Sequence, residues 1–298
     1  MSRRRGKRGC LARLFPLTLV LLIAAAGGAA YLLSQSYQGF GKEVFLDFAK
    51  GTSTAEMADQ LASAGVIRSE WQFLAVRALH PKARLQAGEY RFSSPASVWT
   101  VFDRIVRGDV FYYEVTIPEG SNIFDIANDV DRLGFIKGKD FLNVARDPAP
   151  IRDLASDAPS LEGYLFPSTY RLTRSTTASQ ICRMMTDLFR KRWQEARGNG
   201  PPPDVNRLVT LASLVEKETG IASDRPAVAS VYANRLRLGM PLDCDPTTIY
   251  AAMLERRYRG VIHRSDLDNA NPYNTYRHTG LPPGPIANPG MASLRSAL

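Results

Sequence analysis

The sequence contains little cysteine and little histidine, with three residues of each in 298. No Cys-x-x-Cys or His-x-x-His spacing occurs, so the usual ligand patterns of zinc sites are missing. We therefore expect no metal site and no cofactor. Beyond the N-terminal region only Cys182 and Cys244 remain, and their spacing leaves open whether they form a disulfide or stay as two separate buried thiols.

Charge of one sign is also scarce outside the N-terminus. The net charge is +9, and six of the positive charges precede residue 14, at Arg3, Arg4, Arg5, Lys7, Arg8 and Arg13. The rest of the chain carries the difference, +3, and shows no basic stripe interleaved with aromatic residues. This balance predicts no nucleic-acid binding.

One long uncharged run follows this basic tail of residues 1–13. It covers residues 14–33 and, at 20 residues, is long enough to span the hydrocarbon core as a helix. Basic residues before it predict a cytoplasmic N-terminus and an extracytoplasmic remainder, anchored in the inner membrane. The alternative is a cleaved signal peptide, with small residues at 24–26 for cleavage. The length of the run favours a retained anchor.

Residues 36–150 contain an internal repeat, with copies near 44–80 and 113–146. Gly51-Thr-Ser-Thr-Ala-Glu-Met-Ala58 resembles Gly120-Ser-Asn-Ile-Phe-Asp-Ile-Ala127, and Gly65-Val-Ile67 resembles Gly134-Phe-Ile136. Each copy predicts a strand, a glycine turn and two short helices. The overall expectation is an α+β fold: two such modules, then a mixed, mostly helical domain over residues 151–298.

Acidic residues stand out at the end of one predicted helix in this second half. Leu208, Leu211, Ala212 and Val215 recur with helical spacing and form an apolar stripe. Glu216 and Glu218 flank that stripe about 160° apart, so one cleft can use only one of them directly. Helix geometry does not say which, and both could equally be surface residues.

Six motifs in this order resemble the YceG-like family, the endolytic murein transglycosylases. They are Leu161-Glu-Gly-Tyr-Leu-Phe-Pro167, Glu216-Lys-Glu-Thr219, Val231-Tyr-Ala-Asn-Arg-Leu236, Asp245-Pro-Thr247, Asn274-Thr-Tyr276 and Gly280-Leu-Pro-Pro-Gly-Pro-Ile286. The resemblance implies a bacterial envelope enzyme that cuts peptidoglycan glycan strands internally, forms 1,6-anhydro-N-acetylmuramic ends and terminates nascent strands. It also implies that the repeat modules are LysM-like and that cell-wall synthases are partners.

The catalytic acid of this family is the second glutamate of the Glu-Lys-Glu-Thr motif, which is Glu218 here. We expect Leu214 and Val215 to desolvate it, as a catalytic acid requires. The predicted substrate-binding residues are Glu162, Tyr164, Asn234, Asn274 and Tyr276. For Glu162 a structural contact in a turn is the alternative, and Asn234 could instead tie down a loop.

The family pattern continues past the Asn-Pro-Gly turn at residues 288–290, so the resemblance implies a catalytic domain truncated at its C-terminus. A different class of function also fits the anchor and the repeat, namely a noncatalytic, membrane-anchored scaffold that binds peptidoglycan. The catalytic half discriminates between the two, because a scaffold has no need for Glu218 within a set of cleft motifs.

Overall fold

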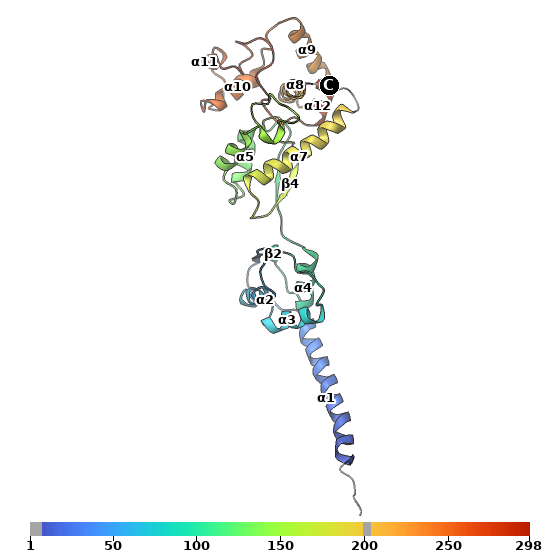
Figure 1. Cartoon of the computed structure of the whole chain (residues 1–298). Helices are drawn as coiled ribbons and strands as arrows, with labels where there is room; N and C mark the ends of the chain where they lie inside the picture. Colours follow the sequence, from blue (N-terminus) through green and yellow to red (C-terminus); the bar gives the residue numbers. More distant parts are fainter. Residues whose placement is uncertain (1–7, 199–203) are drawn as a thin grey trace, which may run out of the picture. The chain divides into compact units, whose positions relative to one another are not determined.

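The chain forms two compact units, Met1–Tyr112 and Tyr113–Leu298. The computed structural model, drawn in Figure 1, describes residues 8–198 and 204–298. Each unit combines helices with one two-stranded antiparallel sheet. The predicted α+β class, mixed and mostly helical, is therefore confirmed.

The first unit packs three short helices around its sheet. Its elements are α1 (Arg8–Ser34), β1 (Val44–Phe48), α2 (Thr54–Ser63), α3 (Glu70–Leu79), β2 (Gly88–Phe92) and α4 (Val98–Arg107). Strand β1 pairs with β2 so that Val44 lies opposite Phe92. Helix α4 ends at Gly108, whose φ of +68° is the left-handed conformation that glycine adopts without strain.

Helix α1 leaves several apolar side chains exposed, among them Leu19, Val20, Leu21 and Ile23. No helix in the described part of the chain is both long enough and apolar enough to qualify as a membrane span. The span predicted at residues 14–33 is only partly covered by this finding, because the side chains of residues 14–18 and 22 lie outside the described set. Residues 1–7 of the predicted basic tail also lie outside it.

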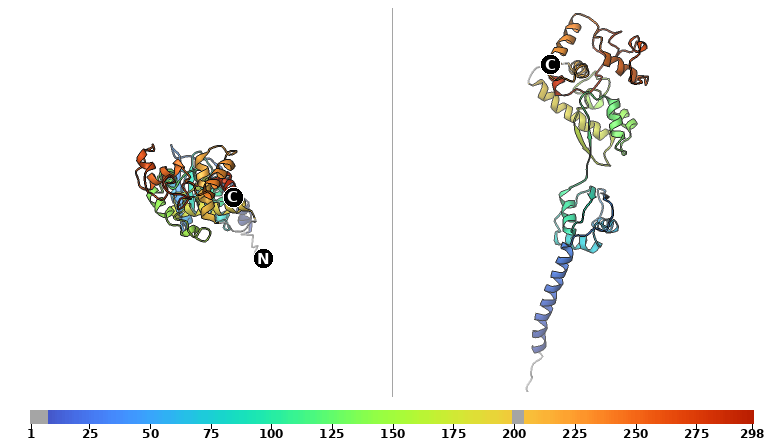
Figure 2. Two further views of the ribbon diagram at one scale, coloured as in Figure 1. Left: turned by 90° about the horizontal axis from the view of Figure 1, so that it is seen from above. Right: turned by 180° about the vertical axis from the view of Figure 1, so that it is seen from behind.

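The second unit begins with a strand and two helices and continues into a helical region. Its elements are β3 (Tyr113–Thr116), α5 (Ile123–Asp131), α6 (Gly138–Ala145), η1 (Ala149–Ile151), β4 (Thr169–Leu172), α7 (Ala178–Arg197), α8 (Val205–Glu218), α9 (Arg225–Arg237), α10 (Asp245–Leu254), α11 (Arg264–Leu267) and α12 (Met291–Ala297). Helix α12, at the red end of the colours in Figure 2, packs against α7, α8 and α9.

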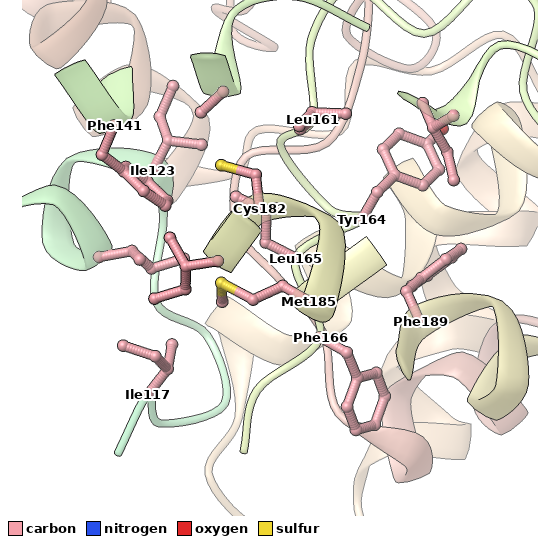
Figure 3. Close-up of a cluster of buried hydrophobic side chains, with 14 of the residues drawn as sticks. Ile117, Ile123, Phe141, Leu161, Tyr164, Leu165, Phe166, Cys182, Met185 and Phe189 are labelled. Carbon is pink, nitrogen blue, oxygen red and sulfur yellow. The ribbon is translucent and has the colours of Figure 1, made fainter. Parts of the chain in front are cut away.

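A single hydrophobic cluster joins the start of this unit to its long helix α7. Figure 3 shows Ile123 and Phe141, from α5 and α6, beside Cys182 and Met185 of α7. Figure 3 also shows Tyr164 near Phe189, with ring centroids 5.2 Å apart in an edge-on arrangement. This shared core includes Leu161, Tyr164, Leu165 and Phe166 of the Leu161–Pro167 motif.

The repeat is present as two β-α-α segments, β1-α2-α3 and β3-α5-α6. Its equivalent glycines, Gly51 and Gly120, both have positive φ, at +94° and +77°. The division into units nevertheless differs from the predicted boundary at residue 150. Strand β3 pairs with β4, and α6 packs on α7, so the second copy shares its core with the predicted catalytic region.

Candidate active site

Two glutamates near the end of α8 leave the helix on opposite sides. Glu216 is buried, whereas Glu218, the last residue of the helix, is exposed. The buried face includes Leu211, Ala212 and Val215, as the apolar stripe predicted. Of the two glutamates, Glu218 is therefore the one exposed to solvent.

Glu216 forms a buried ion pair. One of its oxygens accepts a hydrogen bond from Nη2 of Arg225 at 2.7 Å, and the other accepts one from the backbone N–H of Gly290 at 2.9 Å. Arg225 also lies 3.6 Å from Glu119. Glu216 therefore ties α8 to α9 and to the turn before α12, which fixes the end of the helix that carries Glu218.

Glu218 is held through one oxygen only. Tyr232 of α9 donates a hydrogen bond from its hydroxyl to Oε2 of Glu218 at 2.9 Å. No hydrogen bond within the described chain reaches the other oxygen, Oε1. The prediction that Leu214 and Val215 desolvate this acid is wrong, because both point into the core while Glu218 leaves the helix at its exposed end.

Three further side chains, Cys244, Asp245 and Tyr276, lie beside this pair. We call the set of Glu218, Tyr232, Cys244, Asp245 and Tyr276 the Glu218 cluster. Cys244 precedes α10 and lies near Tyr232 and Glu218, and burial raises the pKa of its thiol to about 11. Asp245 opens α10 and accepts a hydrogen bond from the Tyr276 hydroxyl at 2.6 Å. That bond raises the pKa of Tyr276 to about 12, so its hydroxyl keeps its proton at neutral pH.

Glu162 lies away from this cluster and is fully buried. Its Oε2 accepts the backbone N–H of Ile123 at 2.9 Å, and its Oε1 accepts Nδ2 of Asn288 at 2.9 Å. Burial raises the pKa of this carboxyl to about 8, against the opposing effect of these hydrogen bonds. The geometry contradicts the predicted contact with sugar and matches the structural alternative.

Tyr164 and Asn274 are also buried, and their polar atoms bond to the protein. The Tyr164 hydroxyl donates to Oδ1 of Asn206 at 2.9 Å. Nδ2 of Asn274 donates to the backbone carbonyls of Asp266, Leu267 and Asn269 at 2.7 to 3.2 Å. Both predicted contacts with substrate are contradicted, because neither side chain reaches the surface. Asn274 instead shapes the loop that carries Tyr276.

Asn234 is exposed but belongs to another face of α9. It follows Tyr232 by two positions, so its side chain leaves the helix about 160° away from the face that meets Glu218. Its predicted contact with substrate stays a prediction. Of the six predicted site residues, only Glu218 and Tyr276 lie in the cluster.

The described part of the chain contains separate cysteines and no cluster of metal-binding side chains. Cys182 and Cys244 are both free and buried, so the alternative of two separate thiols is confirmed. Across residues 8–198 and 204–298, no group of three or more His, Cys, Asp or Glu side chains is placed to hold a metal ion. The chemistry available at the cluster is that of carboxyl, phenol and thiol groups.

Sequence reasoning missed Tyr232, Asp245 and the pair formed by Glu216 and Arg225. Tyr232 and Asp245 stand inside two of the six motifs, so position in a motif was a usable signal for both. Arg225 offered none, because only the folded chain brings it to Glu216, nine positions earlier.

Comparison with known proteins identifies a family and several relatives of this chain. The profile of the YceG-like family matches residues 46–298. A protein named endolytic murein transglycosylase from Bacillus subtilis strain 168 is 32% identical, over 86% of this chain and 75% of its own length. One of the same name from Streptococcus pneumoniae strain D39 is 28% identical, over 86% of this chain and 52% of its own length, so the chain spans about half of that relative.

A solved structure gives independent support. The crystal structure of a YceG-like protein from Listeria monocytogenes superimposes with a TM-score of 0.55 at 27% identity, covering 87% of this chain and 90% of that one. The match of the family profile covers most of the chain, including every residue of the Glu218 cluster. The chain therefore belongs to the YceG-like family.

Proposed function

We propose that this chain is an endolytic murein transglycosylase and that Glu218 is its catalytic acid and base. The observation that carries the proposal is the position of Glu218, exposed at the end of α8 and held by Tyr232 through one oxygen. The two relatives named above bear the name of this activity. The family motif supports the assignment of the acid.

The reaction needs one carboxyl group that acts twice. Glu218, in its protonated form, donates its proton to the glycosidic oxygen between N-acetylmuramic acid and N-acetylglucosamine as that bond breaks. The resulting carboxylate then takes the proton from the C6 hydroxyl of the same muramic residue while that oxygen attacks C1. One product strand ends in 1,6-anhydro-N-acetylmuramic acid, the other begins with N-acetylglucosamine, and Glu218 is protonated again.

Removing the acid tests this proposal. Glu218→Gln keeps the shape of the side chain and the acceptor for Tyr232, but the amide cannot supply the proton. We expect this variant to stay folded and to release no anhydromuramic ends from purified, uncrosslinked glycan strands. Full activity in the variant would refute the assignment of Glu218.

The noncatalytic scaffold is not favoured. A scaffold offers no reason for an accessible glutamate that a buried tyrosine holds by one oxygen. Loss of product formation in Glu218→Gln, with binding to glycan strands unchanged, would separate the enzyme from a scaffold directly.

The membrane anchor is part of the same proposal. Residues 14–33 would hold the chain in the inner membrane, with residues 1–13 in the cytoplasm and the second unit outside. The uncharged run and the exposed apolar side chains of α1 support this arrangement. Protease added to spheroplasts should digest the second unit and spare an epitope tag fused before Ser2; digestion of the tag would contradict this orientation.

The first unit is proposed to be a LysM-like module that binds glycan. Its order of strand, two helices and an antiparallel closing strand supports that reading. Cell-wall synthases are proposed partners on the family resemblance. Residues 36–112 produced alone should co-sediment with peptidoglycan if the first idea holds, and crosslinking in cells should recover synthases if the second does.

A further inference from the structure

The Tyr232 hydroxyl lies between two groups but has only one proton to give. It donates to Oε2 of Glu218 at 2.9 Å, and the buried Cys244 is close enough to influence its pKa as well. An ionised carboxylate can only accept, whereas a thiol can donate. Tyr232 is therefore the donor in this bond and the Glu218 carboxylate is the acceptor.

This direction is stable at neutral pH. Burial raises the pKa of Tyr232 far above its usual value, and the nearby Cys244 and Glu218 raise it further. Burial likewise keeps the Cys244 thiol protonated, with a pKa of about 11. The hydroxyl therefore remains a donor, and rotation away from Glu218 would give up its bond to a charged acceptor.

We infer that Tyr232 is a positioning residue that reserves Oε1 of Glu218 for the substrate and stabilises the carboxylate formed when the proton is delivered. The inference rests on the proposed function of Glu218. Because Tyr232 is buried, it does not touch the glycan itself. Its hydroxyl engages Oε2, so the oxygen that carries the proton to the glycosidic bond is Oε1.

The charges around Glu218 give this single donor its importance. Lys217, the adjacent cation, is turned away and donates to the backbone carbonyl of Gly120 at 3.2 Å. Cys244 and the acidic Asp245, at the start of α10, supply no positive charge. Among the described residues, Tyr232 is then the one hydrogen-bond donor to the Glu218 carboxylate.

The test is Tyr232→Phe in the full chain, which keeps the ring in its packing and removes only the hydroxyl. We expect kcat to fall about tenfold to a hundredfold, the effect of one lost hydrogen bond to a charged group, with KM unchanged. We also expect the high-pH limb of the activity profile to move to higher pH, because the ionised carboxylate has lost its donor. Production of anhydromuramic ends from a labelled glycan strand measures both.

A second variant predicts the opposite shift. Site-specific incorporation of 3-fluorotyrosine at position 232 keeps the shape and makes the hydroxyl a stronger donor, so the high-pH limb should move to lower pH. This variant also keeps the proposal testable if Tyr232→Phe fails to fold. Opposite movement of the limb in the two variants is the result that a merely structural role would not give.

Two results would overturn the inference. An unmoved limb in both variants, whether or not kcat and thermal stability fall together, would leave Tyr232 with a structural role only and the proposed function standing. Wild-type protein that releases no anhydromuramic ends would refute the proposed function, and the inference with it.

Discussion

Glu216 and Glu218 stand two positions apart but should have different roles. We expect Glu216 to support stability and Glu218 to support activity. The side chains of Glu216 and Arg225 are only 4% and 7% exposed, and their charged atoms are 2.7 Å apart. Replacing Arg225 by methionine keeps an unbranched stem but removes the guanidinium, and it leaves the Glu216 carboxylate buried with the Gly290 N–H as its remaining hydrogen-bond donor.

The expected cost follows from that burial. Breaking a buried ion pair by removing one partner typically destabilises a protein by about 3 to 5 kcal/mol, because the other charge stays desolvated. Arg225→Met should therefore lower the free energy of unfolding of the second unit by that amount. Glu218→Gln, at an exposed position, should change it by no more than about 0.5 kcal/mol.

A double variant isolates the charge pair from mere loss of contacts. Glu216→Gln combined with Arg225→Met removes both charges and keeps an oxygen to accept the Gly290 N–H. We expect the double variant to lower the free energy of unfolding by clearly less than the sum of the two single variants. Each single variant leaves one unpaired charge buried, whereas the double variant leaves none.

Urea unfolding followed by fluorescence measures these differences. Trp193 is buried in the second unit, whereas Trp71 and Trp99 belong to the first. With Trp71 and Trp99 replaced by phenylalanine, the signal reports the second unit alone. A cost below about 1 kcal/mol for Arg225→Met, or additive single and double variants, would refute the role assigned to the buried pair.

Three further outcomes follow from the same geometry. The folded state binds the Glu162 proton more tightly than the unfolded state does. The free energy of unfolding should therefore fall as pH rises from about 4.5 to about 8, by at most about 1.4 kcal/mol per pH unit. Glu162→Gln should flatten that slope in thermal melts. Asn274→Ala strands buried backbone carbonyls and should cost about 2 to 3 kcal/mol in the same urea assay; a neutral result would contradict the bonds described. Tyr276→Ala should raise KM about threefold to tenfold if its ring packs on sugar, while Tyr276→Phe should leave KM nearly unchanged; equal KM values for both would exclude the ring as a contact.

The elements that local pattern controls could be predicted from the sequence. The apolar stripe of α8 predicted its buried face, and α4 ends at Gly108, a residue type that commonly closes helices. Helix α7 also begins at a local signal, because the side chain of Thr177, its N-cap, accepts the N–H of Gln180. In each case the decisive contacts lie within a few positions of the chain.

Contacts between distant positions could not be read in this way. Glu162 accepts a hydrogen bond from Asn288, which lies 126 positions later, so no local pattern reveals that its carboxyl is buried. A motif gives the residue types of a site without saying which of them face the substrate. Asn274 illustrates this, because it carries the expected amide but donates its hydrogen bonds to the carbonyls of its own loop.

The boundary between the units was missed for a related reason. The second repeat copy looks like the first along the sequence, but β3 finds its partner strand at β4, beyond the predicted boundary. Helix α9 gave a second difficulty, because apolar side chains such as Val231 and Leu238 remain exposed on it while Tyr232 is buried. Its sequence therefore did not show which face would meet Glu218.

The most direct test of the account is digestion of purified, uncrosslinked glycan strands in water labelled with heavy oxygen, with the products identified by mass spectrometry. If Glu218 directs attack by the sugar's own C6 hydroxyl, the new ends are anhydromuramic, carry no heavy oxygen and are absent with Glu218→Gln. New ends that contain heavy oxygen would show that water is the nucleophile, and unlabelled anhydromuramic ends from Glu218→Gln would show that another group is the acid. Either result would contradict the central claim.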